Sequence, residues 1–102
     1  IPESSGMVRV RVVRARAIQM KRFKGIGIYT NAEMNNQQIK KYCQLDQLTT
    51  ELLKQAVIKL KLSARSYFRI LKLSRTIADL AGRESIVLED VAEALQFRAK
   101  EE

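Results

Sequence analysis

Residues 62–82 read LSARSYFRILKLSRTIADLAG and contain the start, two distinct faces and the end of one long helix. Ser63 is a good N-cap, because its hydroxyl can accept a hydrogen bond from a backbone N–H of the first turn. Gly82 is a good stop signal, since glycine easily adopts the left-handed conformation that follows a helix. We therefore expect a helix that begins after Ser63 and runs to about Ala81.

This helix is expected to bury one face and to present a basic stripe on another, because both sets of residues recur at spacings of three and four. The core face holds Tyr67, Ile70, Leu71, Ser74, Ile77, Ala78 and Ala81. The second face holds Arg65, Arg69, Lys72, Thr76, Asp79 and Arg83. One helix is thus expected to carry both a core stripe and a basic stripe.

Two shorter helices are expected before this segment. Asn35 or Asn36 can cap the first, at residues 37–42. Asp46 or Thr49 can cap the second, which runs to about residue 61. Its amphipathic stripe consists of Leu48, Leu52, Leu53, Ala56, Val57 and Leu60.

One more helix is expected after it, from Glu89 to about Ala99. Its acidic first turn and its basic last turn both suit the helix dipole. The position before it is Leu88, which is a poor cap, and residues 86–88 are expected to be a short extended link. The inward face is expected to hold Val91, Ala92, Leu95 and Ala99.

The N-terminal segment allows two interpretations. Apolar and basic residues alternate from Val8 to Val12, which is the period of a half-buried strand. The stretch then continues to Phe23 without a turn signal, and this length is ordinary for a helix but long for a strand. A helix here would take its N-cap from Ser4 or Ser5. Residues 24–36 hold glycines and asparagines and are expected to form a loop.

Length and composition bound the class of protein. The chain has 102 residues, 46% of them apolar, which suits one small domain and is too short for a parallel α/β enzyme with its own substrate domain. The expected fold is all-α, a bundle of four or five helices over residues 1–102. No apolar run approaches the roughly 20 residues that cross a membrane, and no secretory signal is visible. With a single cysteine, a reducing, cytoplasmic location is expected.

Several kinds of chemistry are excluded by composition. The chain has no histidine and one cysteine, Cys43, so it cannot supply a Ser-His-Asp or Cys-His arrangement or a Cys/His zinc site. The glycines in residues 24–27 do not fit a phosphate-binding loop. Because no nucleophile has a base beside it, we expect no catalytic residue, no metal site and no autonomous enzyme.

The charge of the chain is uneven. The net charge is +8, and residues 1–41 carry nine basic and two acidic residues, whereas residues 84–102 carry two and six. This asymmetry favours a polyanion or an acidic protein surface as partner, although solvated helix faces explain it equally well. The candidate contacts to phosphate or nucleic acid are Arg9, Arg11, Arg69 and Lys72.

Arg65 is the most informative single position. It falls in the first turn of its helix, near the positive end of the dipole, where a cation is mildly disfavoured. A nearby anion would relieve this. The alternative hypothesis is that Arg65 pairs with Asp46 or Glu51, or is simply solvated.

Taken in order, several segments resemble the C-terminal domain of magnesium-chelatase-like AAA+ ATPases of the ComM (YifB) group. The most specific segment is residues 62–82, and the resemblance covers nearly the whole chain. It also includes the opening at residues 3–16, and the segments NAEM (31–34), IKKYCQLD (39–46) and DVAEALQFR (90–98). Two positions depart from the family pattern: Val10 stands where an acid is common, and Leu88 replaces a polar cap.

The resemblance implies a helical lid that follows a P-loop ATPase core, with the Walker motifs outside this chain. It favours the helical interpretation of residues 5–23, which would form an entry helix (1–23), followed by a loop (24–36) and a helical core (37–102). ATP and Mg²⁺ are implied for the longer protein, as are a ring hexamer and a role in DNA processing and natural transformation. Arg65 matches the sensor-2 arginine, which contacts the γ-phosphate of ATP.

Two alternatives remain open. The chain can be a stand-alone basic helical module that binds nucleic acid directly, through its basic N-terminal segment and the stripe that starts at Arg65. Such binding would depend strongly on salt. It can also be a helical interaction domain without a ligand.

Overall fold

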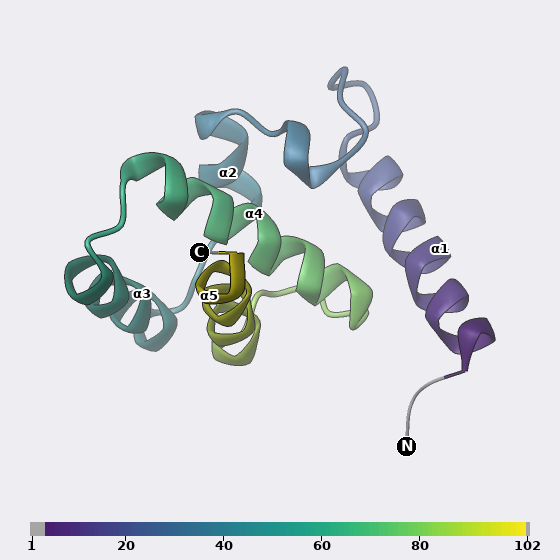
Figure 1. Cartoon of the computed structure of the whole chain (residues 1–102). Coiled ribbons are helices and arrows are strands. Elements are labelled where there is room, and N and C mark those ends of the chain that lie inside the picture. The colour runs from purple at the N-terminus through teal and green to yellow at the C-terminus, as the bar shows by residue number, and fades with distance from the viewer. Residues whose placement is uncertain (1–3, 102) are drawn as a thin grey trace.

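The computed structural model describes residues 4–101, with side chains described for residues 4–98. The elements are α1 (Ser5–Arg22), the 3₁₀ turn η1 (Asn31–Glu33), α2 (Asn36–Tyr42), α3 (Gln47–Leu60), α4 (Ala64–Leu80) and α5 (Leu88–Glu101) (Figure 1). The all-α fold that the sequence predicts is confirmed over this part of the chain. No helix within it is long and apolar enough to span a bilayer.

Four helices begin with side-chain caps: α4 at Ser63 as predicted, and α1, α2 and α3 each at one of the two candidates that the sequence offers. In each, a side-chain oxygen accepts the backbone N–H three residues later and so satisfies a donor that the helix itself cannot pair. The distances are 3.2 Å for Ser4, 2.9 Å for Asn35, 2.7 Å for Asp46 and 3.1 Å for Ser63. At Asp46, the hydroxyl and the backbone N–H of Thr49 also lower the pKa of the carboxyl.

The expected start of the last helix is wrong by one residue. Leu88 is the first residue of α5, so it does not stand in the cap position. The Asp90 carboxylate reaches back and accepts the Val87 N–H at 2.9 Å, and it also pairs with Arg83. A carboxylate of the first turn thus stabilises this helix start without a polar cap residue.

The end of α4 agrees with the glycine signal. Gly82 has a φ of +76°, the N–H of Arg83 donates to the Ala78 carbonyl, and the N–H of Gly82 donates to the Asp79 carbonyl. This pair of hydrogen bonds is a Schellman motif, which favours glycine at the left-handed position. The chain therefore turns sharply between α4 and α5.

The core surrounds α4, which contacts α1, η1, α2 and α5, whereas α3 packs mainly on α5 (Figure 1). The shared feature of the core residues is nearly complete burial of an apolar side chain, which provides most of the stabilisation. They are Phe23, Met34, Ile39, Cys43, Leu53, Ile70, Leu71, Ala78, Ile86, Val91 and Ala94. The core face expected for α4 is confirmed except at Ala81, which is exposed.

Helix α1 lies at one edge of the molecule and packs mainly on α4 (Figure 1). Only Ala15 and Gln19 are buried within it. On its other side, four exposed apolar residues recur at spacings of three and four along the helix, and we call this line the outer stripe. Its members are Val10 (64% exposed), Val13 (59%), Ala17 and Met20 (63%).

Candidate functional site

Arg65 lies in the first turn of α4, two residues after the Ser63 cap, and its side chain is exposed. The two acids considered as partners are occupied elsewhere: Asp46 caps α3, and Glu51 lies 4.0 Å from Lys54. Among the residues whose side chains the structure describes, Arg65 has no hydrogen bond or ion pair. Its guanidinium is therefore available to an anion from outside the described chain.

Arg69 and Lys72, which follow on the same helix, line a groove of about 380 Å³ between α4 and α5. The structure adds to them a third cation, Arg98 of α5, which the sequence analysis did not single out. The Lys72 ammonium donates a hydrogen bond to the Ala32 carbonyl at 3.0 Å. Two of the predicted contacts thus share one site with an unexpected third.

Arg9 and Arg11 lie on a different part of the molecule. Both belong to α1; Arg9 is exposed, and Arg11 lines a separate gap between α1 and the α4–α5 pair, as does Glu93. The structure therefore does not bring the predicted basic residues into one continuous surface. It divides them between α4 and α1.

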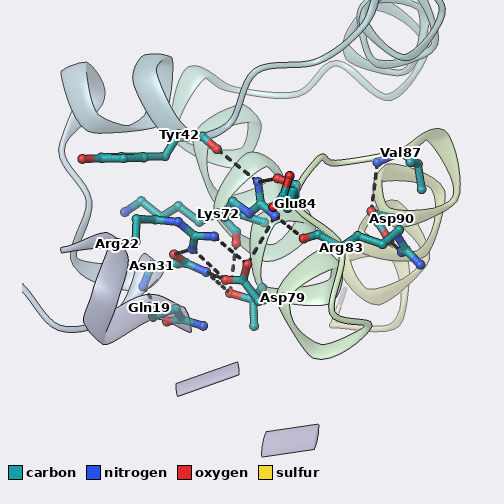
Figure 2. Close-up of polar contacts among 12 residues, drawn as sticks. Gln19, Arg22, Asn31, Tyr42, Lys72, Asp79, Arg83, Glu84, Val87 and Asp90 are labelled. Atoms are coloured by element: carbon teal, nitrogen blue, oxygen red, sulfur yellow. Dashed lines mark hydrogen bonds and ion pairs between the residues drawn. The ribbon is translucent and has the colours of Figure 1, made fainter. Parts of the chain in front are cut away.

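A buried polar cluster around Asp79 is the feature that the sequence analysis missed (Figure 2). Asp79 was expected on the basic stripe and not on the core face, but its side chain is completely buried. Arg22 of α1 binds it in a bidentate manner, with both Nη–Oδ distances at 2.7 Å. Such a pair fixes the relative orientation of the two side chains in addition to attracting them, because the planar guanidinium forms two parallel hydrogen bonds with the carboxylate.

Asn31 of η1 completes the cluster. Its side-chain amide donates to Asp79 Oδ2 at 2.9 Å and its carbonyl oxygen accepts from Arg22 at 3.0 Å. Its backbone N–H donates to Gln19 Oε1 at 3.0 Å. Residues from α1, η1 and α4 are thereby joined through buried hydrogen bonds, so α1 has a defined position despite its small apolar contact (Figure 2).

Arg75 is the second cation beside Asp79, with 3.3 Å between Arg75 Nη2 and Asp79 Oδ1. It also donates to the carbonyls of Arg83 and Glu84, each at 3.0 Å, and so fixes the turn between α4 and α5. Burial lowers the pKa of Arg75, and the neighbouring Asp79 opposes that shift. An arginine and an aspartate four residues apart are visible in the sequence, but that spacing also occurs on exposed helix faces.

Cys43 is a core residue without a chemical role in this arrangement. Burial raises the pKa of its thiol from the ordinary 9.0 to about 11, although Arg75 and Arg22 act in the opposite direction. The thiol is therefore protonated at neutral pH and poorly nucleophilic. Within the described residues, no three Cys, Asp or Glu side chains gather as a metal site would require.

These features define the class of the protein as a small all-helical domain over the described residues. The chain belongs to the family of the magnesium chelatase subunit ChlI C-terminal domain, which matches residues 2–98. A bundle of the AAA+ lid type fits this family.

Relatives of known sequence support the same assignment. The chain is 45% identical to competence protein ComM of Haemophilus influenzae over 97 residues, which is 95% of the chain and 18% of that protein. It is 36% identical, over the same shares, to the uncharacterised protein YifB of Salmonella typhimurium and of Escherichia coli. The chain thus spans about a fifth of the length of these relatives.

Proposed function

We propose that this chain is the C-terminal helical lid of a longer magnesium-chelatase-like AAA+ ATPase, and that Arg65 is its nucleotide-sensing arginine. In this proposal the longer protein binds ATP and Mg²⁺, assembles as a ring hexamer in the cytoplasm, and takes part in DNA processing during natural transformation. The family assignment supports the type of protein, and the name of the Haemophilus relative agrees with a role in competence.

The observation that carries the role of Arg65 is its exposed guanidinium at the start of α4. A cation near a helix N-terminus opposes the helix dipole, so an incoming anion would improve its environment. A guanidinium can donate two parallel hydrogen bonds to phosphate oxygens and stabilise the charge of phosphoryl transfer. Because α4 is the central helix of the core, Arg65 would move with the lid as a rigid body.

The outer stripe of α1 supports a contact with further protein. Val10, Val13 and Met20 are each more than half exposed, and exposed apolar side chains in one line are a common feature of protein interfaces. In the proposed ATPase this stripe packs on the P-loop ATPase domain that precedes the lid. The hydrogen bonds from Arg22 to Asp79 would then transmit movement of the ATPase domain to α4.

The test is the substitution Arg65→Ala in the longer protein. We expect ATP turnover to fall by about 10³-fold, because arginines that stabilise the transferring phosphoryl group contribute effects of this size. Arg65→Lys should recover only part of the activity, since an ammonium lacks the planar fork. Steady-state ATP hydrolysis is the measurement.

Lys59→Ala is the matched control, because Lys59 is an exposed cation on α3. This variant should retain full turnover. Equal turnover of the Arg65→Ala variant and the unmodified protein would contradict the assignment, provided that circular dichroism shows an intact fold.

Direct DNA binding by this chain is the second candidate function. It is favoured by the clustering of Arg69, Lys72 and Arg98 on one groove. The measurement is binding of a duplex oligonucleotide to the chain at increasing salt, where a steep loss of affinity is expected from counterion release. Absence of binding at low salt would remove this candidate.

A further inference from the structure

The exposed side of α1, at the edge of the molecule, carries the outer stripe with cations on both of its flanks (Figure 1). The stripe runs from Val10 to Met20, which is about 15 Å along a helix. Because a helix advances by about 100° per residue, Arg9 and Arg16 lie along one flank and Lys21 along the other. The 18 residues of α1 include no Asp or Glu. This face therefore offers apolar surface and positive charge without a carboxylate from its own helix.

The three flanking cations are available to a partner. Arg9, Arg16 and Lys21 are exposed, and among the residues whose side chains the structure describes, none of the three side chains forms a hydrogen bond or ion pair. Arg14 differs from them, because it donates to the Leu80 carbonyl at 2.9 Å and so holds α1 against α4. The large apolar members of the outer stripe are each more than half exposed, so they also have free surface for a contact.

The spacing of the outer stripe favours a second helix as the occupant. Side chains that recur at intervals of three and four residues form ridges that pack into the grooves of a facing helix. The small side chain of Ala17 lies between Val13 and Met20 along the stripe, so a facing helix can approach closely there. Carboxylates that border the apolar residues of that helix would then pair with the cations on the flanks of α1.

Charge and composition disfavour three other occupants. The same face of a second copy would bring cations against cations and no carboxylate, which is repulsive. Helices that lie on a membrane surface carry Trp, Phe or Leu on their apolar side, whereas this stripe consists of two valines, one alanine and one methionine. A nucleic-acid backbone would bind the cations but leave the apolar stripe without a matching surface.

We propose that this face of α1 binds a helix whose apolar stripe is bordered by glutamates or aspartates, and that the ATPase domain of the longer protein supplies this helix. The inference rests on the proposed function, which places the outer stripe against that domain, and it adds the chemistry of the contact. The relatives contain further protein that can supply such a helix, since the chain spans 18% of the Haemophilus protein. The contact weakens as salt is added, because its charges are exposed before docking.

The first experiment measures fluorescence anisotropy of a fluorescein-labelled helical peptide, titrated with the full 102-residue chain at low salt. In this peptide, glutamates border a line of leucines at spacings of three and four. We expect saturable binding. Replacing the glutamates by lysines, or the leucines by serines, should each weaken it by at least about tenfold, because each change removes one of the two recognition elements. Equal binding of the lysine peptide would overturn the proposal.

Variants of the chain locate the binding to α1. Arg16→Glu and Val13→Ser change exposed residues, so the fold should persist, which thermal unfolding followed by circular dichroism checks. Each should weaken peptide binding by about tenfold or more. The matched controls on α3, Lys59→Glu and Ile58→Ser, make the same changes at exposed positions and should alter binding by less than about twofold. Equal effects on the two helices would overturn the proposal.

A second experiment identifies the occupant by repeating the titration with the longer protein. If its ATPase domain covers α1, the peptide should bind at least about tenfold more weakly than it binds the 102-residue chain, because the two compete for one face. Equal binding would overturn the assignment of the occupant. Phosphatidylserine vesicles and a thymidine oligonucleotide are the competing probes. If either binds through Val13 and Arg16 while the peptide does not, the proposal fails.

The result is separable from the test of the nucleotide-sensing role, because the peptide titration involves neither ATP nor Arg65. A chain that does not bind the peptide, together with a large loss of turnover in Arg65→Ala, would reject the acidic helix and retain the proposed lid function. Peptide binding together with unchanged turnover in Arg65→Ala would support the docking face and reject the role of Arg65.

Discussion

At the scale of single residues, Asp79 determines how three segments meet. It is completely buried and accepts from Arg22, Arg75 and Asn31, which come from α1, α4 and η1. Taking a carboxylate out of water is costly unless partners compensate for the lost hydration. Here the partners compensate one another, so the loss of Asp79 leaves the buried guanidinium of Arg75 without its carboxylate.

The substitution Asp79→Asn tests this dependence. It keeps the size of the side chain but removes the charge that the buried Arg75 and the partly buried Arg22 share, so we expect the free energy of unfolding to fall by about 3–5 kcal/mol. Urea denaturation followed by circular dichroism is the measurement. Glu84→Gln, at an exposed neighbouring position, should change it by less than about 0.5 kcal/mol. A loss below about 1 kcal/mol at Asp79 would show that the cluster is not required.

At the scale of elements, the N-terminal cap of α4 helps to position Arg65, the residue of the candidate site. Ser63 accepts the N–H of Ser66 at 3.1 Å, and its hydroxyl also donates to the Ser66 hydroxyl at 3.1 Å. This cap fixes the first turn, in which Arg65 lies. The position of the guanidinium therefore depends on an N-cap as well as on the central packing of the helix.

Removing the cap with Ser63→Ala should lower the free energy of unfolding by about 1 kcal/mol, because a backbone donor of the first turn loses its acceptor. Ser63→Asn should retain most of the stability, since asparagine caps equally well. In the longer protein, Ser63→Ala should also reduce ATP turnover by less than Arg65→Ala does. An alanine variant as stable as the asparagine variant would contradict a capping role.

At the scale of the whole molecule, the core contains one titratable thiol. Burial raises the pKa of Cys43 from 9.0 to about 11, so the folded chain holds this proton more tightly than the unfolded chain does. The corresponding stability is fully present below pH 9 and is lost as the pH rises to about 11. Its size is about 2–3 kcal/mol, because one pKa unit corresponds to about 1.4 kcal/mol.

Other groups titrate in the same range, so Cys43→Ala provides the comparison. The stability advantage of the unmodified chain over this variant should shrink by about 2–3 kcal/mol between pH 8 and pH 11. Urea denaturation at the two pH values measures it. A constant difference would mean that the thiol is not desolvated as the structure indicates.

The sequence by itself determined the features that depend on near neighbours. It placed the cap of α4 at Ser63 and its end at Gly82, and it narrowed the caps of α1, α2 and α3 to two candidates each, because these interactions join residues only a few positions apart. The core face of α4 was also predictable, since a helix repeats every 3.6 residues. For α1 the local pattern was ambiguous, and the strand-like alternation of Val8–Val12 lies within a helix.

Only the tertiary structure decided where the charges lie. Asp79 and Arg22 are 57 residues apart, and no helical period shows that they meet inside the protein. The groove likewise needs Arg98 and Phe97 of α5 beside Arg69 of α4. The physical reason is that burial of a charge depends on partners from several elements, which local sequence patterns do not specify.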